Sequence, residues 1–173
     1  MKVYDGSPEE EPTRSEPDRL KVGIAEYEVT TDGAVLTTSG LGSCIGLALY
    51  DPDAGVAGLI HVMLPSAEEA TDGAAAKFAD TGTELLVEEL VAAGASERAL
   101  EAKLAGGSDM LDFSDDGEGI GHRNAAQVRA TLEAHGIPVV GEDVGGDHGR
   151  SLKLEGATGD LVVKSANRES FRL

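Results

Sequence analysis

The chain has little of several residue types, and each shortage excludes a class of protein. Its 173 residues include no tryptophan and only 3% aromatic residues, so small and aliphatic side chains must fill the core. A single cysteine, Cys44, rules out an intrachain disulfide. Only 14 basic residues oppose 32 acidic ones, and no basic stripe is present, which argues against nucleic-acid binding. No apolar run approaches the roughly 20 residues that span a bilayer, and the acidic start lacks a signal peptide's apolar stretch. We therefore expect a soluble, cytoplasmic protein without membrane insertion.

The net charge of −18 is spread along the chain. A hydrated carboxylate surface over a lean core suits a cytoplasm rich in salt, where screening relieves repulsion between like charges. The composition therefore predicts a halophilic source. At this length one domain is expected. Residues 1–19 are acidic and proline-containing, and are predicted to form a disordered N-terminal extension ahead of a folded domain at residues 20–173.

Hydropathy patterns predict more strands than helices. Strands are expected at residues 21–29, 45–50, 56–64, 99–104, 137–140, 151–154 and 161–164, the last two forming a hairpin. Helices are expected at residues 77–93 and 123–135, each followed by a glycine. Loops are expected at residues 66–76 and 113–121. Helices between groups of strands indicate an α/β or α+β sandwich.

The only thiol ends a run of small residues at positions 37–44 that we interpret as a tight turn. A histidine follows on the second of the two strands predicted after this run. Two adjacent strands can place Cys44 and His61 at the same end of a sheet, where the imidazole can take the proton of the thiol. Thr38 can orient that imidazole through its hydroxyl or its carbonyl. Backbone N–H groups near Ser43 and Cys44 can stabilise an oxyanion, and the glycines within residues 40–46 allow close approach of a substrate. From spacing alone, a structural cysteine and a core histidine stay open.

Other polar residues are expected to be structural. His122, His135 and His148 lack the spacing of a metal site and are predicted to be surface or loop residues. The glycine-rich segment at residues 145–150 lacks the lysine and hydroxyl residue of a phosphate-binding loop, so a turn at the rim of the site is expected. Asn124 is expected to cap the second helix. No metal and no cofactor are predicted.

Six segments carry a resemblance to a known family. They are GLGSCIG at residues 40–46, LYDP at 49–52, GLIHVMLP at 58–65, AKLAGGSDM at 102–110, IGHRN at 120–124 and EDVGGDHGR at 142–150. In this order they resemble the CheD family of chemoreceptor glutamine deamidases, of a halophilic archaeal type, over about residues 20–165. Each segment alone is weak, whereas the ordered set is specific.

That resemblance implies a fold and an activity. The implied fold is an α/β three-layer α-β-β sandwich, a single domain with mixed sheets. The implied centre contains Cys44 as nucleophile, His61 as general base and acid, and Thr38 as the residue that orients His61. The implied reaction is hydrolysis of selected glutamine side chains to glutamate on the cytoplasmic helices of methyl-accepting chemotaxis receptors, through a thioester, which tunes adaptation. The chain would then be a protein-glutamine glutaminase, a cysteine amidohydrolase.

Two other functions stay open at this stage. The family resemblance also implies binding to a CheC-type phosphatase, so the chain could act mainly as a regulatory adaptor. Thioester chemistry would equally serve a receptor methylesterase. The intact Cys44, His61 and Thr38 favour catalysis, because a pure adaptor has no physical need for them.

Overall fold

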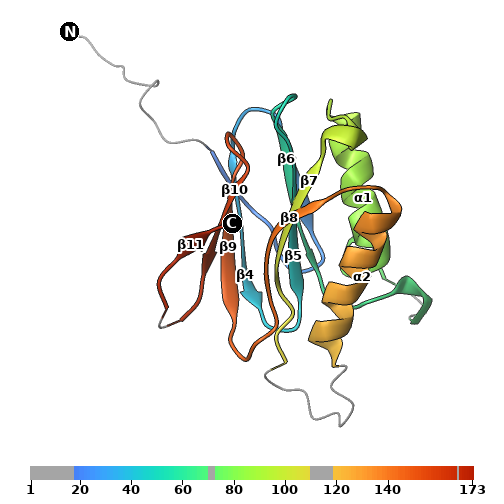
Figure 1. Ribbon diagram of the computed structural model, residues 1–173, viewed down its shortest axis with the longest axis vertical. Coiled ribbons are helices and arrows are strands. Elements are labelled where there is room, and N and C mark those ends of the chain that lie inside the picture. The colour runs from blue at the N-terminus through green and yellow to red at the C-terminus, as the bar shows by residue number, and fades with distance from the viewer. Residues whose placement is uncertain (1–17, 70–72, 110–118, 167) are drawn as a thin grey trace, which may run out of the picture.

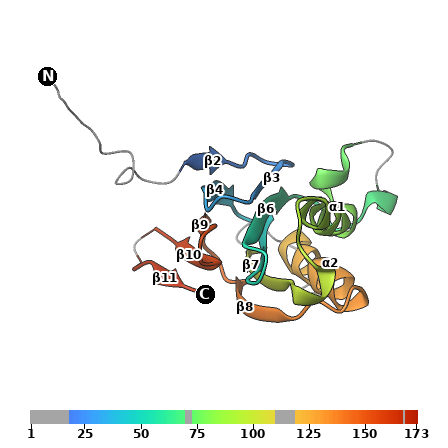
Figure 2. The ribbon, with the colours of Figure 1, turned by 90° about the horizontal axis from the view of Figure 1, so that it is seen from above.

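The computed structural model describes residues 18–69, 73–109, 119–166 and 168–173, which form three layers (Figure 1). Two helices cover one face of a five-stranded sheet, called the inner sheet below. A second five-stranded sheet, the outer sheet, packs on the opposite face of the inner sheet. Figure 2 shows the same layers from above. The expected α-β-β sandwich is therefore confirmed.

Both sheets are mixed, as expected. In order across the inner sheet, the strands are β3 (Tyr27–Thr30), β6 (Val56–Val62), β5 (Ile45–Asp51), β7 (Glu101–Gly106) and β8 (Val139–Val144). In order across the outer sheet, they are β11 (Phe171–Arg172), β10 (Asp160–Lys164), β9 (Arg150–Glu155), β4 (Val35–Leu41) and β2 (Arg19–Lys21). Among the described strands, β7 and β8 form the one parallel pair of the inner sheet, and β2 and β4 form that of the outer sheet. The predicted hairpin of the last two long strands is the antiparallel pair β9–β10.

Two apolar layers hold the sandwich together. The helices are α1 (Ala79–Ala92) and α2 (Ile120–Ala134), close to the expected ranges, and short 3₁₀ turns occur at Ala67–Glu69, Ala75–Lys77 and Glu97–Ala99. Leu86, Leu90, Val128 and Leu132 are buried between the helices and the inner sheet. Leucine, valine and alanine side chains fill the space between the two sheets. Within the described residues, no helix combines the length and hydropathy that a membrane crossing requires.

The prediction of a single strand at residues 21–29 is wrong. The chain forms β2 and β3 there, and these strands belong to different sheets. Between them, Ala25 adopts a positive φ of 62°, and the backbone N–H of Gly23 donates to Glu26 Oε1 at 2.9 Å. An alternating pattern continues through this turn, so periodicity alone cannot detect where the chain changes sheets.

The prediction of a tight turn from Thr37 to Cys44 is also wrong for most of these residues. Residues Val35–Leu41 form β4, and only the segment that follows is a turn. Threonine favours strands through its branched Cβ, which outweighs the turn tendency of its small neighbours.

The hydropathy pattern does not predict β11. The predicted extension lies mostly in residues 1–17, outside the described residues, while Arg19 already belongs to β2; most of the loop expected at residues 113–121 also lies outside the described residues.

Candidate functional site

The two sheets bring Thr38 and His61 into direct contact. Thr38 lies on β4 of the outer sheet and His61 on β6 of the inner sheet. Thr38 Oγ1 and His61 Nδ1 are 2.8 Å apart, and the two residues are 3% and 0% exposed. The pair therefore spans the interface between the sheets in a position shielded from water.

A second hydrogen bond of Thr38 fixes the proton positions on the imidazole. The Thr38 hydroxyl donates to the backbone carbonyl of Val22 at 2.7 Å, and a carbonyl oxygen can only accept. Since the hydroxyl has one hydrogen, the bond to His61 must be donated by the ring, from Nδ1–H to Oγ1. The other ring nitrogen, Nε2, then carries a lone pair and is the basic atom.

The backbone of His61 is held by the turn that links the two sheets. The N–H of Ala25 donates to the carbonyl of His61 at 2.9 Å, and the N–H of His61 donates to the carbonyl of Glu26 at 3.1 Å. The unexpected turn between β2 and β3 thus also supplies Val22, which anchors Thr38. Backbone and side chain of His61 are therefore fixed by the same short segment.

Cys44 lies on the same face of the inner sheet as His61. In the β5–β6 ladder Gly46 is opposite His61, and Cys44 precedes Gly46 by two positions, so strand alternation puts both side chains toward the outer sheet. Cys44, which is half-buried, packs on the apolar cluster between the sheets. The two residues are diagonal neighbours, a relation that separates Cα atoms by about 7–8 Å. The expectation that adjacent strands place thiol and imidazole at one end of a sheet agrees with this register.

The thiol and the imidazole are not hydrogen-bonded to each other in this geometry. His61 Nε2 is buried and has no hydrogen-bond partner among the described residues. Burial raises the pKa of Cys44 above its ordinary 9.0 and lowers the pKa of His61 below its ordinary 6.5. Without a substrate the pair is therefore a neutral thiol and a neutral imidazole whose lone pair is unused.

The carbonyl groups of Gly42, Ser43 and Cys44 all accept hydrogen bonds from neighbouring segments. Gly42 accepts a hydrogen bond from the N–H of Ser108 and Cys44 accepts one from the N–H of Gly107, both at 2.8 Å. The carbonyl of Ser43 accepts one from the side chain of Asn124, also at 2.8 Å. In a trans peptide the N–H points opposite to the preceding carbonyl, so the N–H groups of Ser43 and Cys44 point away from these partners. Neither N–H has a backbone partner among the described residues.

Asn124 belongs to the site in a role that its sequence position does not predict. It does not cap α2, whose N-cap is Gly119 without a side-chain hydrogen bond. Asn124 is instead 0% exposed, and its amide donates to the carbonyls of Ser43 and Met63 at 2.8 and 2.9 Å. It thus joins α2 to the start of β5 and the end of β6. Asn124 is the second residue of the helix predicted at residues 123–135, a position typical of capping, whereas the observed α2 begins at Ile120 and places it one turn inside. The sequence therefore carries no signal of its burial.

The glycines near the thiol have two different roles. At Gly40 and Gly42 an added Cβ would meet nothing within 4 Å, so these positions leave open space beside the loop. Their role in substrate approach stays a prediction. At Gly46 an added Cβ would lie within van der Waals overlap of Leu152 from the outer sheet. The expected role of Gly46 in substrate approach is therefore wrong, because its missing side chain makes room for the packing of the two sheets.

The three remaining histidines lie in different parts of the fold. His122 is exposed in the first turn of α2, His135 contacts Glu97 at 2.9 Å beyond the end of that helix, and His148 lies in the loop before β9. Among the described residues no group of three His, Cys, Asp or Glu is placed to hold a metal ion.

The glycine-rich segment before β9 is a turn, as expected. Gly145 and Gly146 adopt φ values of 87° and 81°. The carbonyl of Gly146 accepts the N–H of Asp109, and the buried Arg150 donates to Gly106 and Gly145 carbonyls while pairing with Asp143. This network supports the segment that holds the carbonyls beside Cys44.

The fold and the site define an α-β-β sandwich domain in which a buried threonine–histidine pair and a half-buried thiol lie on the same face of the inner sheet. Residues 63–165 match the family described as CheD chemotactic sensory transduction. Over its full length the chain is 65% identical to the probable chemoreceptor glutamine deamidase CheD of the halophilic archaeon Haloarcula marismortui, all of which it covers. It is 48% identical, over 90% of its length and 93% of the relative, to the protein of the same name from Natronomonas pharaonis. The chain belongs to the CheD family.

A comparison with solved structures finds the Neisseria meningitidis protein NMB0706. It is similar to this chain with a TM-score of 0.47 and 13% sequence identity, over 84% of this chain and 73% of that protein.

Proposed function

We propose that this chain hydrolyses glutamine side chains on chemoreceptors to glutamate, with Cys44, His61 and Thr38 as its centre. The observation that carries the proposal is the Thr38–His61 pair, because it leaves a basic Nε2 on the face of the sheet that holds the only thiol. The names of the two archaeal relatives support the substrate. The partner of Nδ1 also suits a base, since a neutral hydroxyl orients the ring without raising its pKa as a carboxylate would.

The first half-reaction makes a thioester. When a glutamine side chain enters, His61 Nε2 takes the proton of the Cys44 thiol, and the sulfur attacks the carboxamide carbon. Apo geometries of this kind tighten when the substrate binds. The C=O bond opens to an oxyanion, which the N–H groups of Ser43 and Cys44 stabilise. The imidazolium then gives its proton to the nitrogen, the C–N bond breaks, and ammonia leaves.

The second half-reaction releases the product. A water molecule gives a proton to Nε2 and its oxygen attacks the thioester carbon, forming a second oxyanion in the same place. The C–S bond breaks, the proton returns from the imidazolium to the sulfur, and the carboxylic acid left on the receptor loses its proton to solvent, which gives glutamate. The product carries one more negative charge than the glutamine, which is a change that alters receptor signalling.

The proposal is tested with the full chain and a receptor cytoplasmic fragment in molar salt. Peptide mass spectrometry should show conversion of particular glutamines to glutamate, with ammonia released in equal amount. Methanol release from a methylated receptor fragment separates a methylesterase from a deamidase. If neither product forms while the fragment is bound, the chain is an adaptor and the proposed function is wrong. Binding of a CheC-type phosphatase, which we also propose from the family resemblance, is measured in the same preparation.

Loss of the Asn124 side chain should reduce turnover through the loop ahead of Cys44. We expect Asn124→Ala to lower kcat by about 10–100-fold with little change in KM, since a misaligned oxyanion donor costs about this much. Two buried carbonyls also lose their donor, so the melting temperature should fall. Gln127→Ala is the matched control, because Gln127 lies on the same helix and, among the described residues, its side chain bonds only to Thr131 of that helix. An Asn124→Ala protein with unchanged kcat would show that the amide serves stability alone.

The buried neutral His61 should make the fold sensitive to acid. The pKa of His61 is lowered in the folded protein, so the unfolded chain binds more protons below pH 6.5 and the free energy of unfolding falls as the pH falls. The slope from this one group is at most about 1.4 kcal/mol per pH unit, and it ends at the folded-state pKa. Chemical denaturation from about pH 7.5 to about pH 5.5 measures it, since histidine titrates in that range. The His61→Asn protein should lose less stability over this interval; equal losses would contradict a buried neutral histidine.

A further inference from the structure

The solvent face of the outer sheet carries a basic groove in a strongly acidic protein. The groove has a volume of about 450 Å³ and crosses β2, β4, β9 and β10. Arg19, Lys21, Lys153 and Lys164 line it, which is four of the 14 basic residues of a chain with 32 acidic ones. No acidic residue lines the groove within the described part of the chain. The groove is therefore a positively charged patch on a protein whose net charge is negative.

Strand register places these cations side by side. Lys21, Thr37, Lys153 and Val162 are paired in one row across the four strands, and Ser151 and Lys164 are paired in the next row. Leucines at the alternate positions are buried between the sheets, so these rows point away from the core. Lysine ammonium groups donate hydrogen bonds and accept none, and hydroxyl groups can also donate to a carboxylate, so a carboxylate finds donors along both rows.

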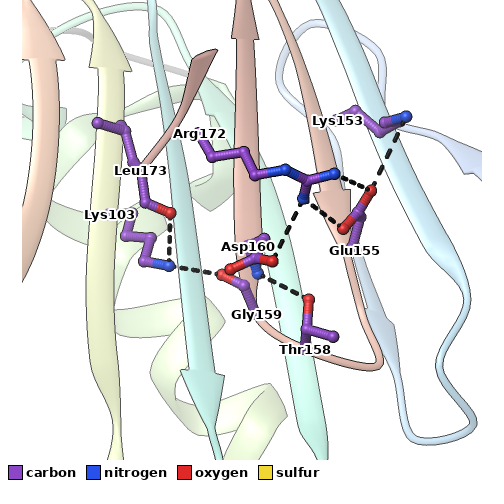
Figure 3. Close-up of polar contacts among 8 residues, drawn as sticks. All are labelled: Lys103, Lys153, Glu155, Thr158, Gly159, Asp160, Arg172 and Leu173. Carbon is purple, nitrogen blue, oxygen red and sulfur yellow. Dashed lines mark hydrogen bonds and ion pairs between the residues drawn. The ribbon is translucent and has the colours of Figure 1, made fainter.

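The acidic residues next to the groove are paired with an arginine. Glu155 and Asp160 lie one register row from Lys153 on the same face, and Arg172 donates to them at 2.7 Å and 3.2 Å (Figure 3). Lys153 reaches Glu155 only at 3.9 Å. Lys21 and Lys164 form no ion pair with any described residue. The cations of the groove thus keep capacity for carboxylates from another molecule.

The groove leads toward the thiol. Ser39 lines it on β4, and an adjoining hollow of about 410 Å³ shares Ser151 and Lys164 with it and extends to Gly40. Gly40 precedes Cys44 by only four residues, at the edge where β4 passes into the loop that begins β5. A chain lying in the groove would therefore extend to the edge of the sandwich at which Cys44 lies.

We propose that this groove binds an acidic stretch of the receptor that flanks the glutamine to be deamidated. The inference rests on the proposed function and adds to it a substrate preference. At molar salt the Debye length is about 3 Å, so only carboxylates in direct contact with the lysines contribute, and a preformed groove provides such contacts. The high negative charge elsewhere on the surface disfavours a long polyanion, whereas a short acidic segment meets only the groove.

The test neutralises the groove and compares two substrates. Lys21→Gln, Lys153→Gln and Lys164→Gln are made singly and together in the full chain. The triple variant should raise KM for the receptor fragment by about tenfold at fixed salt, with kcat and melting temperature unchanged. Its KM for a short neutral peptide with one glutamine should equal that of wild type. Arg98→Gln is the matched control for a single substitution, because it removes an exposed cation from the opposite end of β5.

A mutant cycle identifies the partner. The flanking acidic residues of the receptor fragment are replaced by glutamine. The KM of wild type for this altered fragment should be about tenfold higher than for the unaltered one, whereas the KM of the triple variant should be the same for both fragments. Independent effects, or an unchanged KM in the triple variant, would overturn the groove as the receptor site while leaving deamidation intact. If the triple variant no longer sediments with anionic vesicles while its KM stays that of wild type, the groove binds a membrane surface, and the proposed receptor site is also wrong. A wild type that converts neither substrate would instead refute the proposed function.

Discussion

Cys44→Ser is expected to abolish receptor deamidation in a protein that stays folded. The hydroxyl is far less acidic than the thiol, and a neutral imidazole with a pKa lowered by burial cannot take its proton. We expect conversion of glutamine to fall by about 10⁴-fold or more, as for other lost nucleophiles. The exchange of sulfur for oxygen is small, and Cys44 is half-buried at the rim of the apolar cluster, so the melting temperature should change little.

The single cysteine makes this result easy to check independently. Alkylation with iodoacetamide can modify only one thiol, so the fraction of labelled protein should equal the fraction of activity lost. Site-resolved mass spectrometry of the receptor fragment measures the conversion at each glutamine for wild type, labelled protein and variant. Continued conversion at the same glutamines by Cys44→Ser would refute a cysteine nucleophile. Slow labelling at neutral pH is expected without substrate, because burial raises the pKa of Cys44.

The parts of this site that are local in sequence are predictable. The hairpin of β5 and β6 has a continuous apolar pattern and a turn with proline and glycine, so the sequence alone predicts that Cys44 and His61 lie at one end of adjacent strands. The carboxylate of Asp51, which bonds the backbone N–H groups of Asp53 and Ala54, closes that turn. Patterns over a few residues determine each of these features.

The features that the sequence does not predict depend on contacts between distant segments. The family resemblance associates Thr38 with His61, yet the small residues around Thr38 predict a turn. The strand preference of threonine is a local signal for β4, but nothing local indicates that β4 joins the other sheet. Helix-capping rules assign Asn124 to its own helix, whereas its two partners are 81 and 61 residues away in the sequence. The turn at Ala25 interrupts an alternating stretch that looks like one strand. In each case the tertiary contact decides the role, and capping or alternation rules cannot include it.

His61→Asn is expected to lower deamidation by about 10²–10⁴-fold, the usual contribution of a general base. Asparagine is chosen because its amide nitrogen can take the place of Nδ1 and keep the hydrogen bond to Thr38 Oγ1, while nothing replaces Nε2. The substitution therefore removes the base and preserves the contact between the sheets. Initial rates on the receptor fragment, together with melting temperatures, separate this loss from unfolding.

The pH dependence of the His61→Asn protein distinguishes a base from a structural residue. Without Nε2 the thiol must ionise unaided, so the residual rate should rise about tenfold for each pH unit until the thiol pKa is reached. Burial raises that pKa above 9.0, so the rise should continue past pH 9. Thr38→Val and Thr38→Ser form the matched pair: valine leaves Nδ1–H and the Val22 carbonyl without a partner, whereas serine restores the hydroxyl. A His61→Asn protein whose rate parallels wild type at every pH would mean that another group activates Cys44. A serine variant no more active than the valine variant would mean that the hydroxyl does not orient the ring.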